Sequence, residues 1–241
     1  MMTLTTVCKP ISSLSATVFW RVGSTRNGIL NVTLKAPHED SALVCELVAI
    51  QHLIFKKEVF FESIFSGKGC RLVVSKGAIR KLALGRSNKT YAEKYAAFLD
   101  SRLEGVKIEV SQKMEFMASE AECEVEHIRE TKIDFNIIST PAIGDVRITK
   151  HAFEQYKTRI TSGDPKRPYK SLVKRLNHPE LHIRSLNDRV IAHKTRKYGR
   201  SDNIELWTHV TSVFNYLIVR DDAGNGTLVT VFERNGSFEE D

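Results

Sequence analysis

The segment Ala16–Ala36 (ATVFWRVGSTRNGILNVTLKA) has the composition of two strands joined by a turn. Its halves, Ala16–Gly23 and Gly28–Ala36, are rich in β-branched and aromatic residues, and Asn27-Gly28 between them is a hairpin signal. The residues His38-Glu39-Asp40-Ser41 then supply N-cap chemistry for a long helix, roughly Ser41 to Phe61, whose apolar residues recur at helical spacing. A hairpin followed by a long apolar helix predicts a mixed sheet with helices.

The rest of the first half continues to alternate between strand and helix patterns. Cys70–Ser75 is typical of a short buried strand, Asn88–Leu103 of a helix, and Val106–Val110 of another strand. Ala118–Glu130 is acidic and is expected to be helical. Residues 131–146 contain a Pro and a Gly and have no helical period, which predicts a linker there.

The second half has a different pattern, with helices first and strands afterwards. Thr149 can cap a helix from Lys150 to about Ile160, and a second helix is expected near Tyr169–Leu176. An antiparallel sheet is expected from Val190–His193, Ile204–His209, Phe214–Arg220 and Thr227–Glu233. The sequence therefore predicts an α+β (mixed α/β) chain of two domains, 1–130 and 147–241.

Composition excludes several classes of protein. The chain has 241 residues, of which 41% are hydrophobic and 27% charged, as in an ordinary globular protein. No apolar run approaches the roughly 20 residues that span a bilayer, and the N-terminus lacks the features of a secretory signal. The four cysteines form no CxxC pair, which is typical of reduced thiols. We expect a cytoplasmic, intracellular protein that has no membrane partner.

Positive charge is concentrated between Arg147 and Arg200. This stretch carries fifteen Lys/Arg and four acids, so 15 − 4 = +11, against +7 for the whole chain. Cations neutralise phosphates, and flat rings among them can stack on unpaired bases, which favours single strands or RNA over B-form duplex. A solvated basic face without a ligand is the alternative. The rings in the stretch are His151, Phe153, Tyr156, Tyr169, His178, His182, His193 and Tyr198.

The residues expected to bind nucleic acid come from both helices of the second domain and from the segment after them. They are Lys150, His151, Lys157, Arg159, Lys166, Arg167, Lys170, Lys174, Arg175, Lys194, Arg196, Lys197, Tyr198 and Arg200.

The order of elements over roughly residues 12–130 resembles the ribonuclease H-like fold. Members of that family cleave with two divalent metals held by carboxylates from separate elements. The resemblance places Val22 and Ser75 where two aspartates belong, and it leaves Glu46 and Glu124 as the remaining carboxylates. Without the bridging aspartates, and with Arg21 and Lys76 beside their positions, the site is expected to bind no metal and to be inactive. The basic residues of this domain that remain available to bind phosphate are Lys76, Arg80, Lys81, Arg86 and Lys89.

A second resemblance covers about residues 146–236. The helix start Lys150-His151-Ala152, Arg159 and the late strand Leu228–Arg234 are similar to metal-independent ribonucleases and toxins of the barnase–colicin–RelE type. Such enzymes need a general base, a general acid and a cation over the phosphorane, which the resemblance assigns to His151, Arg159 and Arg196. The chain lacks the second helix Arg that the pattern requires near Gln155-Tyr156.

These observations lead to a main hypothesis and two alternatives. The main hypothesis is a non-catalytic protein that binds single-stranded RNA or mRNA with low sequence specificity, takes no cofactor and clusters with RNA. Its paired nuclease-like folds favour a phage or mobile-element origin. The first alternative is a metal-independent, toxin-like endoribonuclease that uses His151 and Arg159. The second is self-association or docking through the apolar helix 41–61 with Phe60, Phe61 and Phe65.

Overall fold

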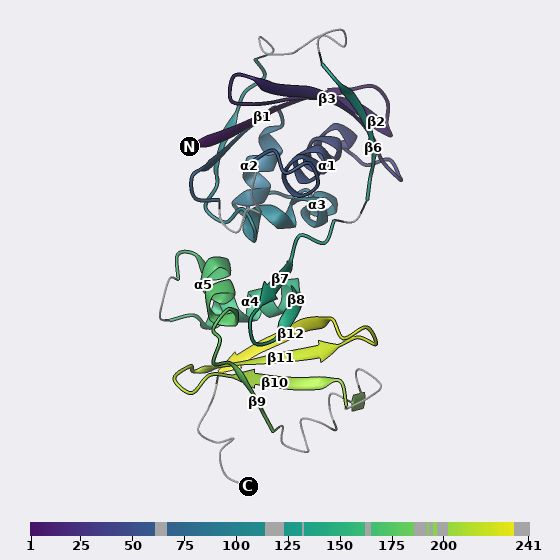
Figure 1. Cartoon of the computed structure of the whole chain (residues 1–241). Helices are drawn as coiled ribbons and strands as arrows, with labels where there is room; N and C mark the ends of the chain where they lie inside the picture. Colours follow the sequence, from purple (N-terminus) through teal and green to yellow (C-terminus); the bar gives the residue numbers. More distant parts are fainter. Residues whose placement is uncertain are drawn as a thin grey trace. The chain divides into compact units, whose positions relative to one another are not determined.

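The structure is a computed structural model, and the chain divides into two compact units, Met1–Phe135 and Asn136–Asp241 (Figure 1). It describes residues 1–60, 67–113, 123–131, 133–161, 165–185, 192, 195–196 and 202–233. The expected fold class is confirmed, because both units combine helices with a mixed sheet of six strands. Within the described residues, no helix is long and apolar enough to cross a bilayer.

The first unit contains a sheet with the order β5-β4-β1-β2-β3-β6. The pairs β1–β2 and β2–β3 are antiparallel, whereas the pairs β1–β4, β4–β5 and β3–β6 are parallel. Figure 1 shows the helices of this unit gathered over one face of the sheet. The strands are β1 (Met2–Pro10), β2 (Ser15–Val22), β3 (Arg26–Thr33), β4 (Cys70–Val74), β5 (Lys107–Val110) and β6 (Val125–Arg129).

The hairpin exists, but its turn differs from the expected one. The turn lies at Gly23–Thr25, where Gly23 has a φ of +65°, and Asn27 and Gly28 belong to β3. Gly28 faces Trp20, and a Cβ at position 28 would lie 2.9 Å from the indole nitrogen. Gly28 therefore makes room for a tryptophan on the neighbouring strand. β1, the first strand of the chain, was not expected from the sequence.

Helix α1 (Ser41–Phe55) is the centre of the first unit's core. The Asp40 side chain accepts a hydrogen bond from the Leu43 N–H at 3.0 Å, which confirms the expected N-cap. Twelve of its fifteen residues are buried, so the apolar surface proposed for docking is already covered. The helix ends at Phe55, earlier than expected; Phe60 is buried, and Phe61 and Phe65 lie outside the described residues.

The other helices of the first unit pack beside α1. Helix α3 (Thr90–Asp100) confirms the helix expected around Asn88–Leu103, and α2 (Gly77–Ala83) was not expected. The prediction of an acidic helix at Ala118–Glu130 is wrong for the described residues, because Val125–Arg129 forms the strand β6. Its backbone bonds to the free edge of β3, and this pairing outweighs the helix preference of the acidic residues.

The second unit has a sheet with the order β7-β8-β12-β11-β10-β9. All neighbours are antiparallel except β8 and β12, which are parallel. The strands are β7 (Ile137–Thr140), β8 (Gly144–Ile148), β9 (His182–Arg184), β10 (Ile204–Thr208), β11 (Phe214–Arg220) and β12 (Gly226–Glu233). The segment expected to be a linker therefore contains β7 and part of β8. The strand expected at Val190–His193 falls almost wholly outside the described residues.

Helices α4 (Lys150–Arg159) and α5 (Pro168–Leu176) begin and end close to where the sequence predicts. Thr149 caps α4 by accepting a hydrogen bond from the Ala152 N–H at 3.1 Å, as expected. The apolar side chains of both helices belong to one core with β8, β10, β11 and β12. This leaves the polar sides of both helices to the solvent.

Candidate nucleic-acid interface and the Glu46 cluster

Helices α4 and α5 contact each other through their buried sides. The Tyr156 and Ser171 hydroxyls are 2.8 Å apart, and the Phe153 and Tyr169 rings meet edge to face with centroids 5.4 Å apart. The Arg175 Nε donates to the Tyr156 hydroxyl at 2.9 Å. These contacts fix the two helices against each other within the second unit.

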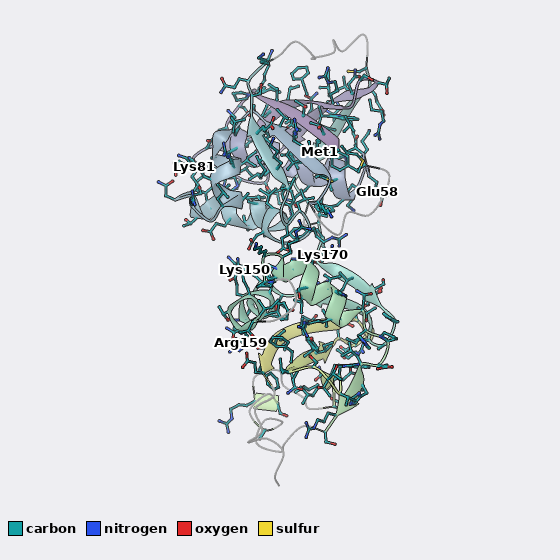
Figure 2. All side chains as sticks on the ribbon, turned by 90° about the vertical axis from the view of Figure 1, so that its left-hand side faces the viewer. Met1, Glu58, Lys81, Lys150, Arg159 and Lys170 are labelled. Atoms are coloured by element: carbon teal, nitrogen blue, oxygen red, sulfur yellow. The ribbon has the colours of Figure 1, made fainter. Side chains whose placement is uncertain are left out.

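The cations expected to bind nucleic acid lie mostly on the exposed sides of α4 and α5 and in the loop between them. Lys150 and Arg159 are at the two ends of α4, and Lys170 is in the first turn of α5 (Figure 2). Arg159, Arg167 and Arg175 are half-buried. The exposed members are Lys150, His151, Lys157, Lys166, Lys170, Lys174 and Arg196, while Lys194, Lys197, Tyr198 and Arg200 lie outside the described residues.

Two of the arginines have structural contacts. Arg175 bonds to Tyr156, and its guanidinium lies 5.1 Å from the centre of the Phe214 ring, so it holds α5 onto the core. Arg159 donates from Nη1 to the Gln155 backbone oxygen at 2.9 Å and to the Gln155 side chain. Arg175 therefore contributes to the packing of the unit, whereas the bonds from Arg159 to Gln155 lie within the last turn of α4.

The expectation that rings are interleaved with the cations for base stacking is only partly met. Phe153, Tyr156 and Tyr169 are at most 5% exposed and belong to the core, so they are unavailable to a base. His151, His178 and His182 are exposed. His193 and Tyr198 lie outside the described residues. The described part of the segment thus favours phosphate contacts over stacking.

The structure places His151 and Arg159 near opposite ends of α4. They are eight residues apart on one continuous helix, which separates them by about 12 Å along its axis. A base and a cation that act on the same phosphate must both reach its few oxygens. Arg196 lies in a separate segment, and no interaction joins it to either residue among those that the structure describes.

In the first unit, Glu46 is the centre of a buried polar cluster. It lies on α1 and is 0% exposed. Its Oε1 accepts from the Thr6 hydroxyl at 2.8 Å and from the Ser75 N–H at 2.7 Å. Its Oε2 accepts from the Ser75 hydroxyl at 2.9 Å and from the Lys76 N–H at 3.0 Å. The carboxylate therefore joins α1 to β1 and to the end of β4.

The electrostatics of this cluster are dominated by burial. Burial raises the pKa of Glu46, and the hydrogen bonds from Ser75, Thr6 and Lys76 lower it by a smaller amount. The pKa of the neighbouring Cys8 thiol is also raised, first by burial and then by the charge of Glu46. Both groups are thus stabilised in their neutral forms.

The cluster does not fit the two-metal site of the ribonuclease H-like family. Mg²⁺ needs accessible oxygen ligands, most of them charged, whereas both oxygens of Glu46 already accept two hydrogen bonds each. The other two positions in the cluster are hydroxyl groups, from Thr6 and Ser75. A hydroxyl group carries no negative charge, so it cannot offset the positive charge of two divalent cations.

Two residues that the sequence assigned to this site, Val22 and Glu124, lie elsewhere. Val22 lies on the second strand, β2, where it pairs with Leu4 of β1. The residue of the first strand that contacts Glu46 is Thr6. Glu124 is exposed and lies next to β6, three strands away from β1 in the sheet order, so it cannot join Glu46. The sequence signal for Thr6 was the alternating run Leu4, Thr6, Cys8, whose members share one face of β1.

The cations expected beside this site have different surroundings. Arg80, Lys81 and Arg86 are exposed on and after α2. Lys76 is half-buried, and Lys89 donates to the Tyr91 hydroxyl at 3.2 Å and to Glu39 at 3.4 Å. Three of the five are therefore accessible to a polyanion without rearrangement.

No protein-family model matches the sequence, and no curated protein is significantly similar to it. One similar solved structure is ribonuclease H1 from the halophilic archaeon Halobacterium salinarum NRC-1, with 12% identity and a TM-score of 0.32. The match covers 53% of this chain and 85% of that one. Similarity at this level does not establish a function. The resemblance to barnase–colicin–RelE-type ribonucleases finds no support among these comparisons and stays a prediction.

Proposed function

We propose that the chain is a non-catalytic RNA-binding protein. In this proposal the solvent-facing sides of α4 and α5 form one basic surface, called here the α4–α5 surface, that holds single-stranded RNA with low sequence preference. The observation that carries the proposal is the exposure of Lys150, Lys157, Lys170 and Lys174 on two helices that are fixed to each other. Recognition is then mainly of phosphates.

The distribution of charge along the second unit supports this assignment. From Lys150 to Leu176 the chain has eight basic and two acidic residues, so 8 − 2 = +6. Residues 201–241, which include three strands of the sheet, have two basic and eight acidic residues, so 2 − 8 = −6. A polyanion is attracted to the first segment and repelled by the second, so it is oriented before contact.

The first unit is proposed to be a ribonuclease H-like domain that has lost its chemistry. The order β5-β4-β1-β2-β3, with three antiparallel strands followed by two parallel ones, is typical of such domains. Glu46 supports the loss of activity, because its oxygens are occupied by hydrogen bonds that hold the core together. The separation of His151 from Arg159 argues equally against a second, metal-free cleavage site.

The test measures RNA binding by the full chain at a series of salt concentrations. The fluorescence anisotropy of a labelled single-stranded RNA reports the binding. If six phosphates are neutralised, log K falls with log[salt] at a slope of about −4. Duplex RNA and single-stranded DNA of the same sequence serve as comparisons. A slope near zero contradicts the proposal.

Cleavage is measured in the same samples by gel electrophoresis, with EDTA and separately with Mg²⁺. We expect intact RNA in both. Cleavage in EDTA that His151→Ala abolishes would establish the alternative, a metal-independent endoribonuclease. Cleavage only with Mg²⁺ that Glu46→Gln abolishes would show that the Glu46 cluster retains activity.

A further inference from the structure

Three side chains with metal-binding chemistry meet at one end of the second unit. They are His178, Glu180 and His209, and their ligand atoms all lie within 4.8 Å of one another. The His178 and His209 rings are 4.1 Å apart between centroids, and the His209 Nε2 is 3.1 Å from a carboxylate oxygen of Glu180. Neither resemblance described above accounts for this cluster.

The backbone brings these residues together for clear reasons. His178 directly follows the C-cap of α5, and its N–H bonds to the Arg175 carbonyl at 3.2 Å. Glu180 comes two residues later, just before β9. His209 directly follows β10, and β9 pairs with β10 so that His182 lies opposite Thr208. The pairing of the strands therefore sets the cluster, and the three residues do not depend on one flexible loop.

We infer that His178, Glu180 and His209 form a site for a divalent transition metal, with Zn²⁺ as the best match. Two imidazoles and a carboxylate are a donor set that Zn²⁺ accepts, with water in the fourth position. In a tetrahedral site with bonds of about 2.1 Å, two ligand atoms lie about 3.4 Å apart. The ligand atoms of this cluster lie within 4.8 Å of one another, so they must approach each other by roughly 1.4 Å at most. His178 and Glu180 are exposed and have room to do so.

His209 has one neighbouring acceptor for the second nitrogen of a metal-bound imidazole, the Thr211 hydroxyl. A metal-bound imidazole uses its other N–H as a donor, usually to an oxygen close by. The His209 Nδ1 accepts a hydrogen bond from the Thr211 backbone N–H at 3.2 Å and lies 3.0 Å from the Thr211 hydroxyl oxygen. Metal binding through Nε2 therefore requires the proton to move to Nδ1, from which the Thr211 hydroxyl oxygen can accept a bond. The His209 side chain is only 13% exposed, so it is the fixed ligand around which the other two can close. The bound metal would join the α5–β9 connection to the β10–β11 turn.

The experiment is isothermal titration of the full chain with Zn²⁺, together with the visible absorption spectrum of the Co²⁺-loaded protein. We expect one saturable site and a Co²⁺ spectrum with ligand-field bands but no thiolate charge-transfer band. His178→Ala and His209→Ala each weaken Zn²⁺ binding by at least tenfold, and Glu180→Gln weakens it to a similar extent. Thr211→Val, which removes only the hydroxyl partner of His209, weakens it about tenfold.

His151→Ala and His127→Ala are matched controls, because both histidines are exposed and lie on other elements. They should leave the Zn²⁺ affinity unchanged. Circular dichroism checks that each variant is folded, and if His209→Ala is not, Glu180→Gln and Thr211→Val still decide the question. The inference is overturned by an absence of saturable Zn²⁺ binding, by binding that all four ligand-region variants leave unchanged, or by a thiolate band that disappears in Cys123→Ser. None of these results affects the proposed RNA binding.

Discussion

The two units treat charged side chains in opposite ways. In the first, Glu46 is fully buried and each of its oxygens accepts two hydrogen bonds. In the second, lysines stand on the outer sides of α4 and α5, whose inner sides carry the core. A buried carboxyl group whose oxygens are all hydrogen-bonded connects parts of the fold and reaches no ligand, whereas an exposed cation adds little stability and can bind an anion. Under the proposed function, Glu46 therefore has a structural role in the first unit, and the exposed lysines of the second unit are the binding residues.

The largest expected effect tests this contrast directly. Replacing Lys150, Lys157, Lys170 and Lys174 with Ala removes about four phosphate contacts, which lowers the salt slope by about 3 and the RNA affinity at 0.15 M salt by about 100-fold. The matched variant changes Lys76, Arg80, Lys81 and Arg86 in the first unit, and we expect a loss of threefold or less. Anisotropy titrations measure both. Equal losses would mean that the units share the binding.

The second effect concerns folding. Glu46→Ala leaves two backbone N–H groups and two hydroxyls without a buried partner, and we expect a loss of about 3 kcal/mol in the free energy of unfolding. Urea denaturation measures it, and the variant should bind RNA normally under conditions where it is folded. A variant as stable as the parent would show that the cluster is not structural.

Glu46→Gln should have a smaller effect that depends on pH. The N–H groups of Ser75 and Lys76 bond to different oxygens, so the new amide always presents an NH₂ to one of them, at a cost of about 1–3 kcal/mol. Because burial raises the pKa of Glu46 in the folded state, its protonation stabilises the fold below the ordinary pKa of a glutamate. This contribution is lost as the pH rises through the raised value.

The cost of Glu46→Gln should accordingly be largest under acidic conditions and shrink as the pH rises. Chemical denaturation of parent and variant from pH 4 to pH 8 measures the difference. A cost that grows with pH would indicate that the hydrogen bonds outweigh burial and that the pKa is lowered instead.

The smallest effect separates structural from binding cations within α5. Arg175→Met keeps the length of the side chain but loses the bond to Tyr156 and the charge over Phe214, at a cost of about 1–2 kcal/mol in stability. Lys174→Met, its exposed neighbour, should leave stability within about 0.5 kcal/mol. Thermal melts measure both. The reverse order would show that Arg175 does not hold α5 onto the core.

The sequence predicted the elements whose patterns are local. Both hairpin strands, β4, β5, α1, α3, α4, α5 and the last three strands, β10, β11 and β12, follow from hydrophobic period and capping, as Asp40 and Thr149 illustrate. The strands β7, β8 and β9 were not predicted. Prediction from the sequence failed where distant pairing decides the structure. Val125–Arg129 becomes a strand only because the edge of β3 is available, and the Asn27-Gly28 signal is overridden by the space that Trp20 needs.

The candidate sites show the same division. Glu46 and Ser75 were found from the sequence because the helix and strand that carry them are regular. Thr6 was missed because β1 was missed, and without β1 the first carboxylate position moved to Val22. The cluster of His178, Glu180 and His209 has no motif, because strand pairing between β9 and β10 brings its members together.

Consecutive strands β5 and β6 form the two opposite edges of the first sheet. The chain between Val110 and Val125 must therefore cross five strand spacings, about 24 Å, before β6 can pair with β3. Pairing between such distant segments adds little stability until the other five strands are in place. We expect β6 to be the last strand to join during folding and the first to exchange its amide hydrogens with solvent, so the sheet grows outward from β1, β2 and β3 and is completed at the β6 edge.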